Sequence, residues 1–361
     1  MMIVKTKTYL ISALAILACG ATQAAEIYRG KDGSTVDLYG RLGFNVSDKK
    51  TGDTQGDFDG RLGFSSRQVV NDTVSVIGLA QYQVNSAEYA NNVEGDNDSL
   101  TARYVWAGLD MSQYGKLTGG RVSSGLIMFT DIGDVFASSD VSTGRQARYI
   151  DPTAVQVFRQ DGTVQYQNSF GNLDFSTAYI IGNNTSDLDY GYNAALRYTL
   201  DMGDAGRLAP VVAFQKTRAD QGEKSRANGA DTFTYGGVGT RYYLGPLMLG
   251  YLYSQDTVTY VNGRADSKDK NHEFTAVYDI NSDWTVRAGY RYLSNKGGDK
   301  LMLRDTTFEV QYKLTPRSSI YTAYILRNGH DGYNAVTGSN VSFGGSSASQ
   351  SFYHAGLRYE F

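Results

Sequence analysis

The feature that most constrains this chain is a strict alternation of apolar and polar side chains, repeated from residue 34 to the last residue. In the final segment the apolar series is Tyr353, Ala355, Leu357, Tyr359 and Phe361. Successive side chains of a β-strand point to opposite faces, so such a segment has one apolar and one polar face. Arginine and lysine recur in the polar series, and burying them in a dry core would be costly. The alternation therefore predicts strands whose polar face lines water.

The first 24 residues have the pattern of a secretory signal peptide. Lys5 and Lys7 form a basic start, residues 9–18 are the apolar core, and residues 21–24 are small, as at a cleavage site. The only cysteine, Cys19, lies in this segment, so the mature chain would contain neither disulfide nor thiol. We expect residues 25–361 to form a single exported domain.

Composition narrows the fold class. Without the signal the chain carries 32 basic and 37 acidic side chains, a net charge of −5 that argues against nucleic-acid binding. No later stretch is apolar for long enough to form a transmembrane helix. With 28 Tyr, 41 Gly and only 4 Pro, the chain should be all-β. Two architectures remain, a secreted β-sandwich or solenoid and an outer-membrane barrel.

Segment lengths favour the barrel. Sixteen alternating segments can be counted: 34–46, 57–67, 73–84, 99–110, 115–122, 155–168, 172–181, 189–200, 206–217, 232–244, 247–256, 270–280, 283–294, 305–315, 318–328 and 350–361. Short turns and long polar loops join them alternately, which is typical of transmembrane antiparallel β-barrels. We therefore predict a 16-stranded barrel.

The two ends and the fourth strand carry a family resemblance. Residues 25–28 and 36–40 read AEIY and VDLYG, residues 102–109 read ARYVWAGL, and the chain ends GLRYEF. These stretches resemble the trimeric general porins of Gram-negative outer membranes, of the OmpF and OmpC type and their Vibrio relatives. The resemblance implies an outer-membrane homotrimer whose pores pass small hydrophilic solutes and ions by passive diffusion. It also implies a third loop that folds inward and narrows each pore.

Site residues follow from the resemblance, position by position. A ladder of basic residues on the barrel wall falls on Arg41, Arg61, Arg103 and Arg159. All four belong to the polar series of their strands. In the third loop Asp131 follows Phe129-Thr130 as in the family, and Asp134 stands near a position where the family has glutamate.

Other positions have subsidiary predicted roles. Three further arginines are candidates for the pore lining: Arg121, Arg145 and Arg148. Glu94 matches the acid of the second loop that reaches a neighbouring subunit. Tyr359 and Phe361 match the C-terminal signal that the outer-membrane assembly machinery reads. Lipopolysaccharide and membrane lipids are expected partners, and the sequence predicts no metal site and no cofactor.

Several alternatives stay open. A substrate-specific porin would line its path with aromatic residues, and no such run can be placed from the sequence. Surface loops could serve mainly as an adhesin or phage receptor. A barrel enzyme would need a histidine beside a nucleophile or an acid, and His272, His330 and His354 lie in no such motif, so no enzymatic activity is expected.

Overall fold

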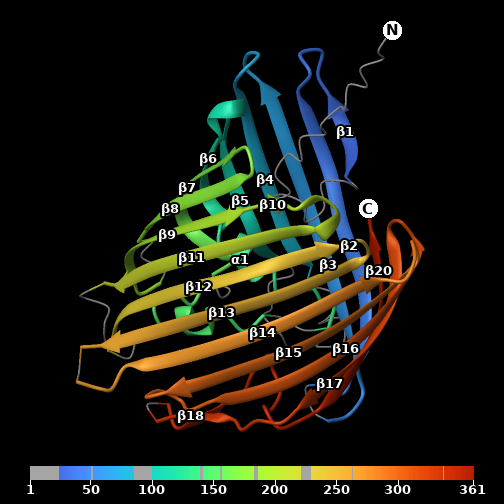
Figure 1. Ribbon diagram of the computed structural model, residues 1–361. Helices are drawn as coiled ribbons and strands as arrows, with labels where there is room; N and C mark the ends of the chain where they lie inside the picture. Colours follow the sequence, from blue (N-terminus) through green and yellow to red (C-terminus); the bar gives the residue numbers. More distant parts are fainter. Residues whose placement is uncertain are drawn as a thin grey trace.

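The chain folds into one closed barrel of sixteen antiparallel strands (Figure 1). The computed structural model describes residues 24–49, 52–84, 100–138, 141–154, 157–182, 186–220, 229–261, 263–335 and 337–361. The first eight barrel strands are β2 (Thr35–Ser47), β3 (Gln55–Val69), β4 (Ser75–Val84), β5 (Leu100–Asp110), β6 (Lys116–Ser123), β7 (Arg159–Phe170), β8 (Leu173–Ile181) and β9 (Leu188–Tyr198). The other eight are β11 (Arg207–Ala219), β12 (Ala230–Leu244), β13 (Leu247–Tyr260), β14 (Ser267–Asp279), β15 (Trp284–Lys296), β16 (Met302–Thr315), β17 (Ser318–Arg327) and β20 (Phe352–Glu360). The predicted sixteen-stranded barrel is thus confirmed.

The barrel closes between its first and last strands. β20 pairs with β2 from Arg41 opposite Glu360 to Ser47 opposite His354. Beyond that ladder, the backbone N–H of Gly40 donates to the carbonyl of Phe361 over 2.8 Å, and the reverse bond measures 3.1 Å. The short strand β1 (Ala25–Arg29) then continues the pairing along the same edge of β2.

Minor elements complete the chain. β10 (Leu200–Asp201) extends the hairpin with β11, and β18 (Gly332–Asn334) pairs with β19 (Ser339–Val341) inside the last long loop. The helical turns are η2 (Ser112–Tyr114), α1 (Ile127–Thr130), η3 (Arg145–Tyr149) and η4 (Gly203–Ala205). No helix in the described ranges is long and apolar enough to cross a membrane.

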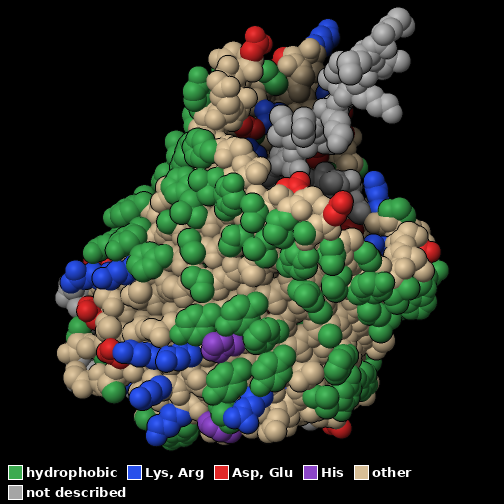
Figure 2. Space-filling model, in the orientation of Figure 1, with side chains coloured by type: hydrophobic (Ala, Val, Ile, Leu, Met, Phe, Trp, Pro, Cys, Tyr) green, Lys and Arg blue, Asp and Glu red, His purple; other side chains and the backbone are tan. Residues whose placement is uncertain are grey.

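The two faces of the wall differ as the alternation predicts. On β14, Phe274 is 50% exposed whereas its neighbour Glu273 is 2% exposed. Exposed apolar side chains of this kind are spread over the outer wall (Figure 2). Because β14 is one stave of a closed barrel, Phe274 faces outward and Glu273 faces the interior.

Residues 124–158, between β6 and β7, form a segment that we call the inner loop. It packs against the inward-facing side chains of β11–β14, where Phe129 of α1 meets the ring of Tyr235 edge-on at 5.9 Å. A Cβ atom at Gly237 of β12 would come within 2.5 Å of the Phe129 ring, so only glycine permits this close approach. The main hydrophobic core therefore lies between this loop and one side of the barrel wall.

Connections at the two ends of the barrel differ in length. Turns such as 171–172, 245–246 and 316–317 are short, whereas 124–158 and 328–351 are long. Long loops lie on the extracellular side of outer-membrane barrels. The predicted signal peptide lies outside the described residues, except for its last residue.

Candidate functional site: the charged lumen

The first group of charges lies on the inner faces of β2, β3, β5 and β7. Arg41 and Arg61 stand directly opposite each other in the β2–β3 ladder. Arg103 lies near the start of β5, and Arg159 is the first residue of β7. The charges of Arg41 and Arg159 lie close enough to Arg61 to act on it. The structure thus brings the four predicted ladder residues into one part of the lumen, which we call the arginine cluster.

Among the residues that the structure describes, carboxylates compensate this cluster only in part. The Arg41 guanidinium binds the Glu360 carboxylate over 2.7 Å and lies 3.6 Å from Asp59. Arg61 approaches the same Asp59 at 3.6 Å. One aspartate therefore serves two guanidinium groups, and a further cation, Arg358, acts on both Asp59 and Arg61.

Neutral groups hold the remaining members of the arginine cluster. Arg103 donates from Nε to Gln81 over 3.0 Å and from Nη1 to Gln83 over 3.1 Å. The Arg159 guanidinium lies 5.7 Å from the centre of the Tyr104 ring. Amides and rings orient these side chains without cancelling their charge, so a positive surplus stays on this part of the wall.

Arg121 binds neighbouring strands to the inner loop. Its Nη1 pairs with Asp161 over 2.6 Å, and its Nε donates to the Arg103 carbonyl over 3.1 Å. Its Nη2 donates to the Thr153 carbonyl of the inner loop over 3.1 Å. With three partners at these distances, Arg121 fixes the loop where it returns to the wall.

Asp131 of the inner loop faces a different pair of arginines. Its carboxylate lies 3.4 Å from Arg241 on β12 and 3.8 Å from Arg197 on β9, and Arg241 also donates to its backbone carbonyl. Burial raises the pKa of Asp131, and the nearby charges of Arg241 and Arg197 offset that rise only partly. Asp131 is therefore paired with these arginines and not with the arginine cluster.

Two other predicted loop residues are exposed. Asp134 is exposed just beyond α1. Arg148 is exposed in η3, with its guanidinium 5.5 Å from the centre of the Tyr149 ring. Neither lies in the buried contact between loop and wall.

Arg145, in η3 of the inner loop, is buried against the barrel wall, with a side chain that is 8% exposed. Its guanidinium binds Asp299 over 2.6 and 3.0 Å and Asp269 over 2.7 and 2.8 Å. Burial alone would lower the pKa of Arg145, but the two aspartates raise it above its ordinary value. Burial opposes ionisation of Asp299, yet hydrogen bonds and charge from Arg145 lower its pKa. This arginine anchors the loop and does not line open water.

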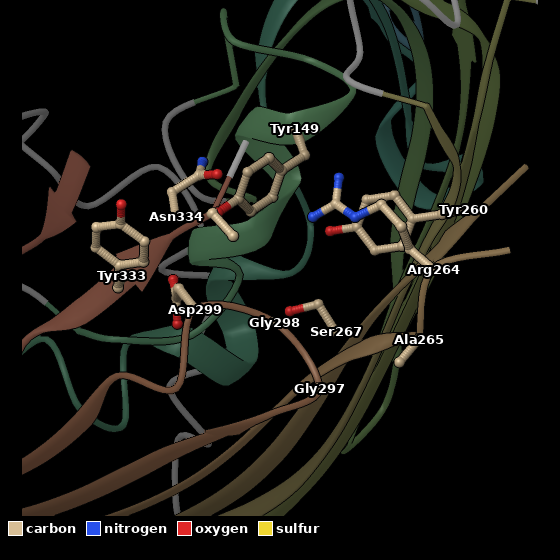
Figure 3. Close-up of a pocket in the computed structure, with 11 residues that line it drawn as sticks. Tyr149, Tyr260, Arg264, Ala265, Ser267, Gly297, Gly298, Asp299, Tyr333 and Asn334 are labelled. Carbon is tan, nitrogen blue, oxygen red and sulfur yellow. The ribbon is translucent and has the colours of Figure 1, made fainter. Parts of the chain in front are cut away.

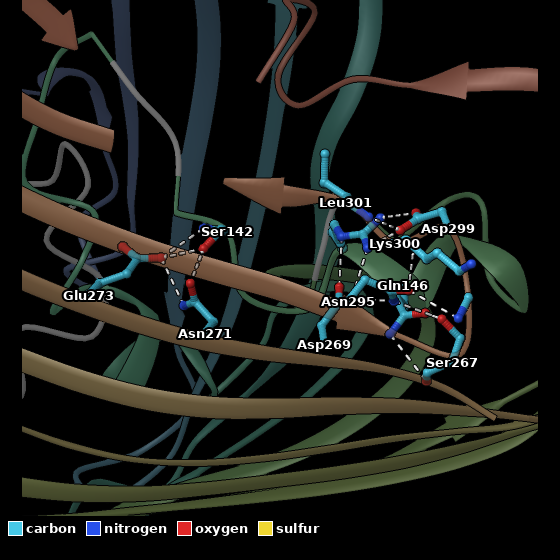
Figure 4. A network of polar contacts seen from close by, with 12 residues as sticks. Ser142, Gln146, Ser267, Asp269, Asn271, Glu273, Asn295, Asp299, Lys300 and Leu301 are labelled. Atoms are coloured by element: carbon cyan, nitrogen blue, oxygen red, sulfur yellow. Dashed lines mark hydrogen bonds and ion pairs between the residues drawn. The ribbon is translucent and has the colours of Figure 1, made fainter. Parts of the chain in front are cut away.

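Two glutamates that the sequence did not single out as site residues hold the backbone of the same loop. Glu273 of β14 accepts from the Ser142 N–H over 2.9 Å and from the Ser142 hydroxyl over 2.7 Å (Figure 4). Glu309 of β16 accepts from the N–H groups of Ala137 and Ser138 over 2.9 and 3.2 Å. Their inward parity could be read from the sequence, but not the segment they bind.

A second buried charge network lies at the long-loop end of β15–β17. Arg327 lies 3.2 Å from Asp305 and donates to the Ser346 hydroxyl over 2.6 Å and to the Phe343 carbonyl over 3.2 Å. Arg291 lies 3.7 Å from the same Asp305. The last long loop is therefore also fastened to the inner wall.

The other predicted residues lie away from the lumen or outside the described ranges. Glu94 lies outside the described residues. Tyr359 pairs with Ser318 and Leu42, and its ring lies 6.0 Å from that of Phe361 at the seam of the barrel. Within the described ranges, no three His, Cys, Asp or Glu side chains are grouped so that they could hold a metal ion.

Comparison with known proteins places this lumen in context. A family model described as Gram-negative porin matches residues 11–332. Outer membrane porin N of Escherichia coli K12 is 30% identical over 329 residues, which cover 82% of this chain and 81% of that protein. Outer membrane porin C of Enterobacter cloacae is 27% identical over 344 residues, with 89% and 92% covered.

Solved structures share the fold. The anion-selective porin from Comamonas acidovorans superposes with a TM-score of 0.72 at 17% identity, covering 91% of this chain and all of that one. The trimer form of OmpT, an outer membrane protein of Vibrio cholerae, gives a TM-score of 0.66 at 17% identity, with 91% and 99% covered. At these identities the likeness concerns the fold alone.

Proposed function

The chain belongs to the Gram-negative porin family and forms a channel in the outer membrane, and we propose that the arginine cluster makes the narrow part of this channel positive. Small hydrophilic solutes and ions would cross by passive diffusion past this charged wall. The observation that carries the proposal is that described carboxylates compensate Arg41, Arg61, Arg103 and Arg159 only in part. Fixed charges in a channel with low-dielectric walls concentrate counter-ions.

The inner loop presents fewer uncompensated acids to the channel than the resemblance implies. Asp131 is compensated by Arg241 and Arg197, and Asp134 is the exposed acid of this stretch. Within the described part of the arginine cluster, four guanidinium groups face two carboxylates, those of Asp59 and Glu360. We therefore propose a preference for anions over cations, together with a transverse field that orients dipolar solutes.

The test is the double variant Arg61→Ser/Arg103→Ser in a planar bilayer with a salt gradient. Two unit charges at ~8 Å in water together contribute about 1 kcal/mol, or roughly fivefold in the local concentration of each ion. The reversal potential should shift toward cation preference, and bulky or cationic solutes should permeate faster.

A matched control removes two positive charges from the outer wall. Lys270 and Arg304 are exposed on outward-facing positions of β14 and β16. Lys270→Ser/Arg304→Ser should leave the reversal potential unchanged. An unchanged reversal potential and unchanged solute uptake in Arg61→Ser/Arg103→Ser would refute the assignment.

We also infer that the chain is a channel and not an enzyme. In support, its relatives are porins, and within the described ranges no histidine is hydrogen-bonded to a Ser, Asp or Glu side chain. His272 contacts the Tyr251 hydroxyl on the outer wall, and His354 stacks on Tyr321. Lipase and protease assays with His272→Ala as control test this inference.

We propose two protein partners, further copies of this chain and the outer-membrane assembly machinery. The chain would form a homotrimer, with Glu94 at the subunit contact, as the family resemblance implies. Closure of single channels in steps of three would support this state, and single closures would contradict it. Tyr359 and Phe361 would serve the assembly machinery, so removal of Phe361 should reduce the amount of protein in the outer membrane.

A basic band on the outer wall is a candidate contact for lipopolysaccharide. Its exposed members are Lys268, Lys270, Lys296 and Arg304, beside His272, near the long-loop ends of β14–β16. Figure 2 shows this group of cationic side chains, while the acids Asp269, Glu273 and Asp305 of the same strands face inward. Phosphate groups in the outer leaflet would complement the band. Loss of co-purified lipopolysaccharide in Lys270→Ser/Arg304→Ser would support the contact.

A further inference from the structure

Four loops meet around one cavity at the long-loop end of the barrel (Figure 3). The cavity has a volume of about 240 Å³. Tyr149 comes from η3, Tyr260 and Arg264 from the end of β13 and the loop that follows it, and Tyr333 from β18. Asp299 lies between these groups (Figure 3). The site lies outside the arginine cluster and has no part in the constriction proposed above.

Three tyrosine rings dominate the lining. Figure 3 shows Tyr333 on one side, Tyr260 beside Arg264 on the other, and Tyr149 between them. Within the described part of the chain, none of the three phenol hydroxyls has a hydrogen-bond partner in the protein. The cavity therefore offers flat apolar surfaces with unused polar groups at their edges, the combination that amphipathic rings recognise.

Charge argues against a cationic ligand in this aromatic pocket. The Arg264 guanidinium already lies 4.2 Å from the centre of the Tyr260 ring. The carboxylate of Asp299 is taken by Arg145, over 2.6 and 3.0 Å. Among the described lining residues, a quaternary ammonium ion would thus meet an arginine at the face of the Tyr260 ring and no free carboxylate. A neutral ligand faces no such opposition.

Size limits the ligand further. Pockets for drug-sized molecules measure roughly 300–1,000 Å³, so a cavity of about 240 Å³ holds a single small ring. We propose that this cavity binds one pyranose ring of a neutral saccharide, whose C–H face stacks on tyrosine while its hydroxyls meet the phenol groups. Because the cavity lies where η3 of the inner loop meets the last long loop, the sugar would be held at the channel mouth.

Saturation-transfer NMR on the purified protein in detergent, with maltose as the probe, tests the proposal. We expect transfer to be strongest to the ring C–H protons. Tyr333 is 56% exposed, so Tyr333→Ala should fold normally, as heat-modifiable mobility on a gel can verify. That variant should weaken maltose binding at least fivefold, whereas Tyr333→Phe should retain most of it.

Controls separate this site from its rivals. Tyr324→Ala removes a tyrosine of similar exposure, 49%, from β17 and should leave binding unchanged. Arg61→Ser/Arg103→Ser should also bind maltose normally, so that failure of the constriction and failure of the sugar site remain distinguishable. Three results would overturn the proposal: no transfer to maltose from the wild type, undiminished transfer in both Tyr333→Ala and Tyr149→Ala, or displacement of maltose by tetramethylammonium.

Discussion

The two sides of the lumen use the same residue types under different conditions. In the arginine cluster, the Arg61 side chain is 27% exposed and shares one aspartate with Arg41. Within the inner loop, Arg145 is 8% exposed and has two aspartates to itself. Both arginines are permanently charged. Whether a loop covers the charge decides whether it acts on solutes or holds the structure together.

Physical chemistry explains why the two sides cannot exchange roles. A partly exposed ion pair is screened by water and contributes little stability, but its field reaches the solute. A covered guanidinium has lost its hydration, so its carboxylate partners must compensate it fully. Glu309 and Glu273 are covered in the same way, and they are compensated by hydrogen bonds from backbone N–H groups of the inner loop.

The largest effect should come from Arg145→Ala. Removing one partner from a buried ionic cluster strands the others, and such changes cost about 3–5 kcal/mol. Asp299 and Asp269 would both lose their cation. We expect the unfolding free energy to fall by that amount in a urea titration of the protein in micelles. Arg148→Ala, an exposed neighbour, should stay close to the wild-type value. Equal values for the two variants would show that burial of Arg145 adds no stability.

Glu309→Gln should have a smaller effect of the same kind. Hydrogen bonds to charged groups contribute about 1.5–3 kcal/mol, and Glu309 accepts two from the loop backbone. We expect faster proteolysis within residues 124–158 and noisier single-channel currents. Glu360→Gln offers the matched change beside the arginine cluster, where the carboxylate is 37% exposed, and should change neither readout.

Loss of two arginines from the arginine cluster should change ion preference and leave stability nearly unchanged. Arg61→Ser/Arg103→Ser removes partly solvated charges, so we expect less than about 1 kcal/mol of change in unfolding free energy. Ion preference, by contrast, should shift as described above. A large loss of stability in this variant would show that the arginine cluster holds the structure together, as Arg145 does.

Strand parity accounts for much of what the sequence predicts correctly. The alternation alone assigns Arg41 and Arg61 to the inward face, and their direct opposition follows from the register of two adjacent strands. The same parity puts Glu273 and Glu309 inside. Local alternation suffices for these statements because each strand has only two faces.

What the sequence could not supply is the path of the inner loop. Arg145 meets Asp269 and Asp299 across separations of 124 and 154 residues. No spacing rule connects a loop arginine with a distant wall, since the contact depends on how the loop crosses the lumen. For the same reason Asp131 could not be matched in advance with Arg241 and Arg197.

The smallest effect should be a pH dependence of ion preference caused by Asp131, the inner-loop acid beside Arg241 and Arg197. Burial raises the pKa of Asp131 above the ordinary value of about 3.9, and one carboxylate oxygen is buried without a hydrogen bond. As pH falls through the raised pKa, Asp131 becomes neutral, so Arg241 loses this carboxylate, whereas Arg197 keeps Asp174 at 2.8 Å. Anion preference should therefore rise on acidification.

Asp131 also makes the stability of the fold depend on pH. Because the folded state binds the Asp131 proton more tightly than the unfolded state does, this group lowers stability as pH rises from the unfolded toward the folded pKa. Acid acts on the whole protein, so the informative quantity is the wild-type response minus that of Asp131→Asn. Asp134→Asn, an exposed neighbour, should keep the wild-type profile in reversal-potential measurements between pH 4 and 7. If Asp131→Asn keeps it as well, the covered loop acid does not couple to the conducting water, and the field arises from the arginine cluster alone.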